Sequence, residues 1–353
     1  MNVALLASYA APYPGNFIPS ILFLNEKMKE RGDGIVFVFP EETKDRDWMK
    51  LFEGEKVYYL PYAPYSPSTI KKLKSIFKTE KIDVIYSHFC GWDISSRLAA
   101  PFKRSVWHCR MNVRTDTAAK KVKYFVKYRI IGGFKTFSMA NTPAVGKKLL
   151  KIAGKKRSNT VCNGIDFSRL NVKNEYPKEK KNVLLFGWQP FVKGLDTACD
   201  AFEKGIENAF LSVSCQQATK QYLQKRYPEK KPCWLEEKEP TNNVSSLYDN
   251  ADIFLSASIT EGFATALAEA LYSGLPCVIS DIEGTNWAWK MKNVFVFKTG
   301  DAESLKAEIE KCKAEPMTRE SAEYNRKIML EKYSLETWAK RVMNALDGKP
   351  DRE

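Results

Sequence analysis

The sequence predicts an α/β protein made of two Rossmann-like domains, each with a doubly wound parallel sheet. Short apolar strands alternate with helical segments in both halves of the chain, which is typical of parallel sheets covered by helices. The length of 353 residues suits two domains of ordinary size. Between the halves, residues 154–181 are polar and lack helical periodicity apart from the short VCNGID motif, which indicates a domain boundary.

Each half supplies its own set of strands and helices. In the first half we expect strands at 3–8, 35–40, 57–60, 84–88, 106–108 and 136–141, and helices near 20–31, 68–80 and 118–137. In the second half we expect strands at 182–187, 210–215, 233–236, 252–258, 276–281 and 294–300, and helices near 196–205, 219–227 and from 302 onward. Ligands bind beyond the carboxyl ends of such strands, so two domains facing each other would form a cleft.

The composition is that of a soluble protein, with 44% hydrophobic and 28% charged residues. No apolar run reaches the length of about 18 residues that spans a bilayer, and the N-terminus lacks the basic start of a signal peptide. We therefore expect a cytoplasmic protein. The eight cysteines are scattered without a CxxC pair and there are only two histidines, so we expect no metal. Asp45-Arg46-Asp47 matches a metal-binding DxD motif superficially, but its charged surroundings indicate a solvated loop.

The positive charge is confined to the first half of the chain. Residues 1–170 contain 30 Lys and Arg against 14 Asp and Glu, whereas residues 171–353 contain 26 against 28. This asymmetry indicates that the first half faces an anionic partner: a nucleic acid, a phosphorylated acceptor or an acidic lipid surface.

The most informative segment is IFLSASITEGFATALAEALYSGLPCVISD, residues 253–281. It reads as a strand, a turn holding Glu261 and Gly262, a helix carrying Glu269, and a second strand. The free N–H groups at the start of this helix, over residues 263–266, suit the diphosphate of a nucleotide sugar. The two carboxylates can then accept hydrogen bonds from sugar and ribose hydroxyls.

This segment resembles the donor-binding motif of retaining glycosyltransferases of the GT-B fold, of the family 4-like group known as glycosyl transferases group 1. The resemblance implies that Glu261 contacts the transferred sugar and Glu269 the ribose. It implies further donor contacts from Gly262, Phe263, Ala264 and Thr265. We expect an N-terminal acceptor-binding domain over 1–160 and a C-terminal donor-binding domain over 161–333. The resemblance also implies that a helix at about 334–347 crosses back to the first domain.

A second segment, FGWQPFVKGLD, follows the first strand of the second half. It resembles the family's G-R-x-x-x-x-K-G phosphate motif, with Gly187, Lys193 and Gly194 in register. The resemblance implies that Lys193 pairs with the donor diphosphate. Trp188 stands where the family usually has arginine, and an indole offers one donor and no charge.

Five residues in the first half are candidates for substrate contact. Gly15 and Asn16, in the turn PYPGNF, offer backbone N–H groups to a phosphate. His108 ends a strand where the family carries a sugar-contacting histidine, and we favour this role for it. His88 ends the neighbouring strand and Arg110 follows His108, which makes both candidates for acceptor binding. A histidine at a strand end is often only a satisfied loop residue, and this alternative is the stronger one for His88.

The stretch over 118–137 alternates lysines with aromatic and aliphatic residues, a composition found in interfacial membrane helices. A packed helix with solvated lysines fits the same pattern.

Together these features predict a metal-independent, retaining glycosyltransferase without a cofactor. It would move a hexose from a nucleoside diphosphate sugar to a lipid-linked or polysaccharide acceptor, in bacterial-type surface glycan assembly. It would act in the cytoplasm, as a peripheral protein at the inner face of the membrane. One alternative is a sugar-nucleotide epimerase on the same fold. Another is a basic nucleic-acid-binding protein, although no nucleic-acid motif is present and we expect no nucleic acid as a partner.

Overall fold

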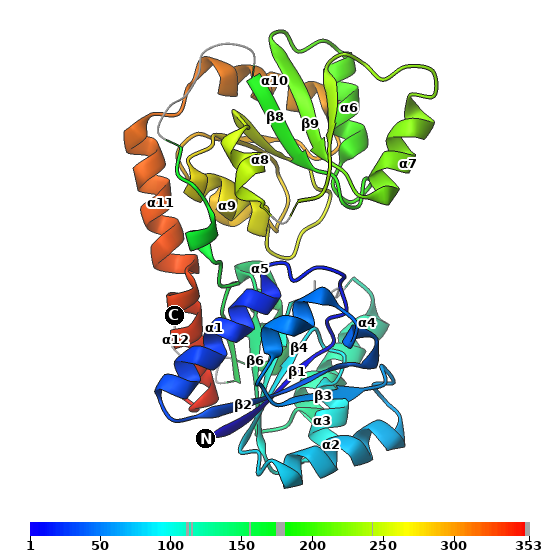
Figure 1. The fold of residues 1–353 in the computed structure, drawn as a ribbon, viewed down its shortest axis with the longest axis vertical. Helices are drawn as coiled ribbons and strands as arrows, with labels where there is room; N and C mark the ends of the chain where they lie inside the picture. Colours follow the sequence, from blue (N-terminus) through cyan, green and yellow to red (C-terminus); the bar gives the residue numbers. More distant parts are fainter. Residues whose placement is uncertain (111–112, 114–115, 155–156, 174–180, 242, 350–353) are drawn as a thin grey trace. The chain divides into compact units, whose positions relative to one another are not determined.

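The computed structural model describes residues 1–110, 113, 116–154, 157–173, 181–241 and 243–349. These residues form two compact units (Figure 1). The first unit comprises Met1–Asp166 together with Tyr333–Glu353, and the second comprises Phe167–Lys332. Both are parallel sheets covered by helices, so the predicted α/β class with two Rossmann-like domains is confirmed.

The first unit is a parallel sheet with the strand order β3-β2-β1-β4-β5-β6-β7. Its strands are β1 (Asn2–Ala7), β2 (Gly34–Pro40), β3 (Val57–Leu60), β4 (Val84–His88), β5 (Arg104–Cys109), β6 (Thr136–Ala140) and β7 (Ser158–Thr160). Its helices are α1 (Phe17–Glu30), α2 (Pro67–Thr79), α3 (Asp93–Ala99), α4 (Ala118–Phe125), α5 (Pro143–Ala153) and α12 (Leu335–Leu346). A π-helical turn, η3 (Val126–Ile131), continues α4.

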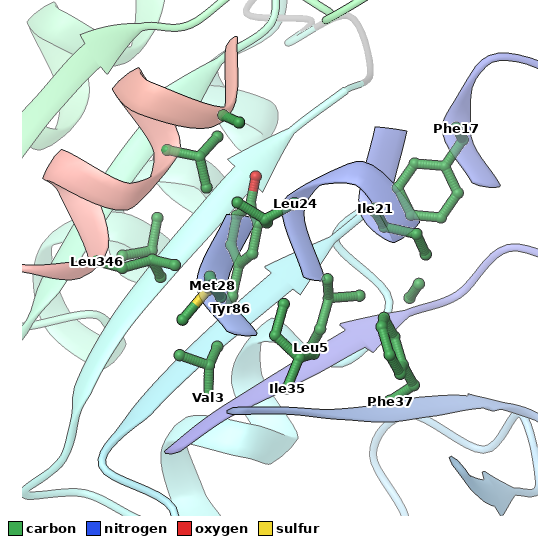
Figure 2. Packing of buried hydrophobic residues seen from close by; sticks show 14 of the residues in the cluster. Val3, Leu5, Phe17, Ile21, Leu24, Met28, Ile35, Phe37, Tyr86 and Leu346 are labelled. Atoms are coloured by element: carbon green, nitrogen blue, oxygen red, sulfur yellow. The ribbon is translucent and has the colours of Figure 1, made fainter. Parts of the chain in front are cut away.

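Helices cover both faces of this sheet, which explains why its central strands are apolar without alternation. On one face, α1 and α12 pack on β1, β2 and β4, with Ile21, Leu24 and Leu346 among the residues that fill the core (Figure 2). On the other face, α2 and the residues around α3 pack on the same strands through Leu73, Phe77 and other buried side chains.

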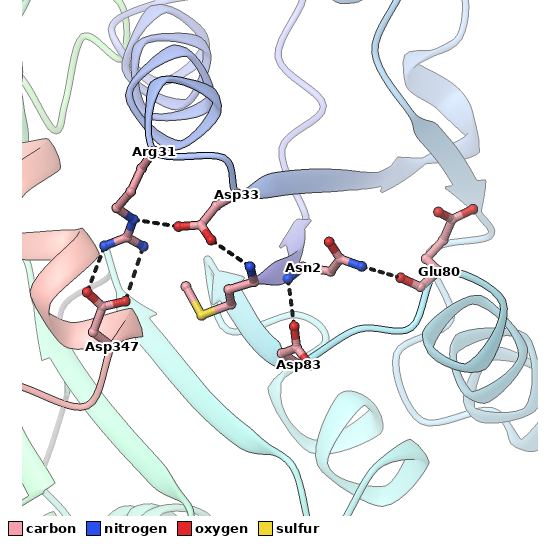
Figure 3. Close-up of polar contacts among 7 residues, drawn as sticks. Asn2, Arg31, Asp33, Glu80, Asp83 and Asp347 are labelled. Atoms are coloured by element: carbon pink, nitrogen blue, oxygen red, sulfur yellow. Dashed lines mark hydrogen bonds and ion pairs between the residues drawn. The ribbon is translucent and has the colours of Figure 1, made fainter.

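Polar contacts fix the edges of the first unit (Figure 3). Arg31 follows α1 and donates two hydrogen bonds, of 2.7 and 3.1 Å, to the Asp347 carboxylate that follows α12. Asp33 accepts from both Arg31 and the N-terminal amine, each at 2.5–2.6 Å. These contacts tie the N-terminal amine and the residue that follows α12 to the turn between α1 and β2.

The second unit has the strand order β10-β9-β8-β11-β12-β13. Its strands are β8 (Lys181–Phe186), β9 (Ala209–Ser214), β10 (Leu235–Lys238), β11 (Ile253–Ser256), β12 (Cys277–Ser280) and β13 (Val294–Phe297). Its helices are α6 (Leu195–Glu203), α7 (Gln217–Arg226), α8 (Ser245–Asp249), α9 (Thr265–Ser273), α10 (Ala302–Ala314) and α11 (Arg319–Tyr333). Buried side chains of α6, α7 and α10 share one core with the sheet.

Two features of the described residues concern membrane and metal binding. None of the described helices is both long and apolar enough to cross a bilayer. The described residues also hold no group of three or more His, Cys, Asp or Glu side chains placed to bind a metal ion.

Candidate functional site

Glu261 lies in the turn between β11 and α9, at the carboxyl end of a central strand of the second unit. The loop after β8 runs alongside this turn, since the Ile259 N–H donates to the Val192 carbonyl at 2.9 Å. Gly194 permits the approach: its φ is +64°, and a Cβ there would lie 2.0 Å from the Ala257 oxygen. The two loops are therefore held together by a position that only glycine fits.

Lys193 and Glu261 form an ion pair, with Nζ 2.5 Å from Oε1. The Ser258 hydroxyl donates to the same carboxylate oxygen at 2.8 Å. Both charged side chains keep some solvent exposure, so a ligand can reach them. The structure thus brings together two residues that the sequence places 68 positions apart. A cation and a carboxylate in contact suit a ligand that carries both a phosphate and hydroxyl groups.

Glu269 projects from α9, and its side chain is only 5% exposed. Arg169 donates to its Oε1, and the Tyr248 hydroxyl donates to its Oε2 at 2.8 Å. Burial, and next the charge of Glu269, raise the pKa of Tyr248 well above its usual value, so this phenol stays a donor. Two donors from different elements thus hold the Glu269 carboxylate in one orientation.

The turn before α9 is packed more tightly than the sequence predicts. The helix begins at Thr265 rather than near Phe263, and the Thr265 N–H donates to the Phe263 carbonyl at 2.8 Å. Phe263 stacks on Trp287, with ring centroids 5.1 Å apart and an interplanar angle of 15°. Gly284 lies against the Glu261 backbone, where a Cβ would meet the Glu261 oxygen at 2.6 Å. Trp287 is therefore a packing partner of the turn that holds Glu261, Gly262 and Ala264.

Gly187 follows β8 directly, and a Cβ there would approach Val213 Cγ1 to 2.7 Å. Its backbone is fixed by a hydrogen bond from Gly187 N–H to the Ser214 carbonyl. Trp188 follows and is exposed, with its ring 5.8 Å from that of Phe186. The position that usually carries a phosphate-binding arginine thus presents an indole to solvent.

In the first unit, Gly15 and Asn16 precede α1 as predicted. Gly15 has a φ of +53°, which the tight turn requires. The Asn16 amide donates to the Gly164 carbonyl, so this side chain ties the start of α1 to the segment that ends the first unit. The Asn16 side chain is therefore engaged within the protein.

The two histidines end neighbouring strands, as predicted, but they are core residues. His108 is 1% exposed. Its Nε2 donates to the Val161 carbonyl at 3.1 Å, so its Nδ1 accepts from the Tyr86 hydroxyl at 2.9 Å. Burial, and next the nearby Arg110 charge, hold the pKa of His108 well below its usual value. Any effect of His108 on a substrate therefore acts through its neighbours.

Arg110 connects His88 with the end of the first unit. Its Nε donates to His88 Nδ1 at 3.2 Å and its Nη1 donates to Asn163 Oδ1 at 3.1 Å. The guanidinium also lies 5.0 Å from the Phe17 ring centroid. Burial lowers the pKa of Arg110 to about 10, and none of the ion pairs among the described residues joins it to a carboxylate. It remains positively charged at neutral pH.

Sequence reasoning missed Arg169 and Tyr248 as partners of this site. Arg169 precedes the second half's first strand, 100 residues before Glu269. Tyr248 lies in the short helix α8, 21 residues before Glu269. No local spacing rule links such positions. The only available signal for Arg169 was its place just after the VCNGID motif.

Comparisons with known proteins concern the family and the fold. Residues 166–329 match the family model "Glycosyl transferases group 1". No curated relative matches at the level of sequence. A glycosyltransferase structure from Rickettsia africae ESF-5 is 16% identical with a TM-score of 0.81, over 98% of this chain and 97% of that chain.

Two further structures of the same fold carry more specific names. Alr3699/HepE from Anabaena, in complex with UDP and glucose, is 15% identical with a TM-score of 0.76, over 98% of this chain and 99% of that chain. The lipopolysaccharide outer core galactosyltransferase WaaB is 13% identical with a TM-score of 0.76, over 99% of this chain and 100% of that chain. Residues 166–329 are thus a glycosyl transferases group 1 domain, and the chain is a glycosyltransferase of the GT-B fold.

Proposed function

We propose that the protein transfers a sugar, with retention of anomeric configuration, from a nucleoside diphosphate sugar to a lipid-linked or polysaccharide acceptor. The contact between Lys193 and Glu261, beside the start of α9, carries this proposal. Lys193 would exchange Glu261 for the donor diphosphate. Glu261 would then accept hydrogen bonds from the sugar, and Glu269 from the ribose.

In the proposed reaction the bond between the sugar C1 and the diphosphate oxygen breaks, and a bond from C1 to the acceptor oxygen forms on the same face. The acceptor hydroxyl gives its proton to the departing phosphate, so no protein nucleophile is needed. Negative charge develops on the leaving diphosphate, where Lys193 and the amino end of α9 stabilise it. These groups supply positive charge, and we propose a reaction without a metal or other cofactor.

The first unit, with the helix α12, would hold the acceptor, and the second would hold the donor. Gly15 and Asn16 would offer backbone N–H groups to the diphosphate. Arg110, which the buried His88 orients, would hold an anionic group of the acceptor. His108 would act as a positioning residue through Tyr86. The basic first half, and the similarity to a lipopolysaccharide outer core galactosyltransferase, support a role in surface glycan assembly at the inner face of a membrane.

The first test is a donor screen. UDP, GDP, ADP and their sugars should be compared by thermal shift, since a ligand at 100 times its Kd stabilises the folded protein by about 2.7 kcal/mol. The best donor is then incubated with and without acceptor lipid extracts. We expect one nucleotide to raise the Tm and acceptor-dependent release of its diphosphate. Isomerisation of the donor without transfer would identify an epimerase. Salt-dependent RNA binding without any nucleotide effect would favour the nucleic-acid alternative.

Trp188 offers a second test, because an arginine is expected at its position. Trp188→Arg should lower the Kd of the donor by about tenfold, since a charge-assisted hydrogen bond contributes about 1.5–3 kcal/mol. Isothermal titration with the donor measures the change. Phe191→Arg adds the same charge to another exposed position of the same loop and serves as the control. Equal effects of the two variants would show that only net charge matters.

A further inference from the structure

The outer surface of α4 and η3 exposes apolar side chains that a soluble protein usually buries. No residue of α4 is buried. Val122 is 61% exposed, and Phe125, Val126 and Ile130 are exposed as well. In a helix of about 3.6 residues per turn, Val122, Phe125 and Val126 share one face. Lys121 and Lys123 each lie about 100° from Val122, one on either side of this face. The apolar stripe is therefore bordered by cations on both sides.

The last turns of this helical segment are anchored to the rest of the first unit. The Lys127 ammonium lies 2.6 Å from the Asp93 carboxylate, and Tyr128 is buried against Trp107. Burial opposes the charge of Lys127, but the Asp93 carboxylate outweighs it and raises the pKa of Lys127. With its inner side fixed in this way, the segment keeps its apolar stripe facing outward.

Two more exposed phenylalanines lie where β5 and β6 begin. Phe102 is 88% exposed and Phe134 is 95% exposed. The buried Arg97 holds both loops, because it donates to the Pro101 and Lys103 carbonyls and to the Gly132 carbonyl at 2.8–3.2 Å. The buried Arg97 guanidinium thus holds the two loops that carry the exposed Phe102 and Phe134.

Cations surround these phenylalanines. The residues immediately before the adjacent parallel strands β5, β6 and β7 are Lys103, Lys135 and Arg157. The Arg157 guanidinium lies 5.4 Å from the Phe134 ring centroid. Residues 94–165 contain seventeen Lys and Arg and a single acidic residue, Asp116. Asp116 is itself paired with Lys120 at 2.8 Å.

We propose that this surface, formed by Val122, Phe125, Val126, Ile130, Phe102 and Phe134 with the surrounding lysines and arginines, binds a bilayer that contains anionic lipid. The partner must be both anionic and apolar, which an acidic membrane surface is. A second copy of the chain would bring one cationic surface against another. Nucleic acid would use the cations but leave the apolar side chains unused.

This inference rests on the proposed function, which includes a lipid-linked acceptor. The position of the surface on the first unit is compatible with that function. The chain from β5 to β6 is a crossover between parallel strands, so α4 and η3 lie along a face of the sheet. A bilayer on this surface leaves the carboxyl ends of the strands open.

Cosedimentation with vesicles, without any donor, tests the surface. Vesicles of phosphatidylcholine alone are compared with vesicles containing about one third phosphatidylglycerol, at low and high salt. We expect binding only to the anionic vesicles. Phe102→Ala/Phe134→Ala should weaken it about tenfold or more through lost apolar burial. Lys121→Gln/Lys123→Gln should weaken it about tenfold and reduce its salt dependence.

The controls are Leu330→Ala and Lys327→Gln, both at exposed positions of α11 in the second unit. These variants should bind vesicles like the wild type. An unchanged thermal shift with the nucleotide shows that each variant folds, and it tests donor binding separately from membrane binding.

Vesicle binding that does not depend on lipid charge or on salt would overturn the proposal. A dimer in analytical ultracentrifugation that the phenylalanine variant dissociates would assign the surface to a second copy. RNA binding that needs the lysines but not the phenylalanines would assign it to nucleic acid.

Discussion

Glu261→Gln is expected to reduce the rate of sugar transfer by about 100-fold or more, a loss comparable to the removal of one well-placed catalytic hydrogen bond. The amide keeps the shape of the side chain but loses the charge that accepts from the sugar and pairs with Lys193. Donor affinity should fall much less, because Lys193 is then free to meet the diphosphate. Transfer is measured by release of the nucleoside diphosphate, and donor binding by isothermal titration.

Lys193→Met should show the opposite pattern. It removes the cation and leaves a partly buried Glu261 carboxylate near the diphosphate, so donor binding itself should fall. In the double variant Lys193→Met/Glu261→Gln, the unpaired carboxylate is gone and binding should recover in part, while transfer stays lost. A double variant whose losses simply add would contradict the exchange of partners proposed for Lys193. Wild-type turnover in Glu261→Gln would remove the catalytic role of Glu261.

Arg169→Met is expected to abolish most of the preference for a ribonucleotide over its 2′-deoxy counterpart. In the wild type, a ribose hydroxyl donating to the Glu269 carboxylate should favour the ribonucleotide by about 10-fold or more. Arg169 is a charged partner of the buried Glu269 carboxylate. Without it, Glu269 would lose a contact that fixes its position, and the preference should shrink to a few-fold. Paired titrations of the two nucleotides on each variant measure this ratio.

Tyr248→Phe provides a graded comparison, since it removes one donor to Glu269 and leaves the Arg169 charge in place. It should reduce the preference less than Arg169→Met does. Arg326→Met is the matched control: Arg326 belongs to the same unit but donates to the Tyr272 carbonyl at 3.2 Å. An equal loss of affinity for both nucleotides in Arg169→Met would indicate a general effect on the fold rather than positioning of Glu269.

Much of the fold could be predicted because buried parallel strands are apolar on both faces. The expected strand at 84–88 coincides with β4, for example. The edge strand β10 was predicted two residues too early, since its sequence LEEK is polar and the preceding Trp234 is not. The helix α3 was missed because its buried face carries Asp93, Ser96 and Arg97 rather than apolar residues. The helix α5 was missed although Thr142 and Pro143 form a typical helix start.

The candidate site could likewise be predicted only in part. Lys193 and Glu261 each belong to a short motif at the end of a strand, and neighbouring parallel strands bring such ends together. The partners Arg169 and Tyr248 come from a connecting segment and a short helix, where no periodicity indicates which way a side chain points. The burial of His108 could not be predicted either, since its ring contacts Tyr86 and the Val161 carbonyl, which lie 22 and 53 positions away in the sequence.

The place of α12 has a consequence for synthesis. Its residues Trp338, Val342 and Leu346 lie in the same core as Val3 and Leu5, which are made more than 300 residues earlier. A nascent chain emerges at about 5–20 residues per second. The first unit therefore waits tens of seconds with one face of its sheet covered by α1 but not by α12, while the second unit has all its strands and can close first. Although its strands come first in the sequence, the amino-terminal unit is the last to be completed.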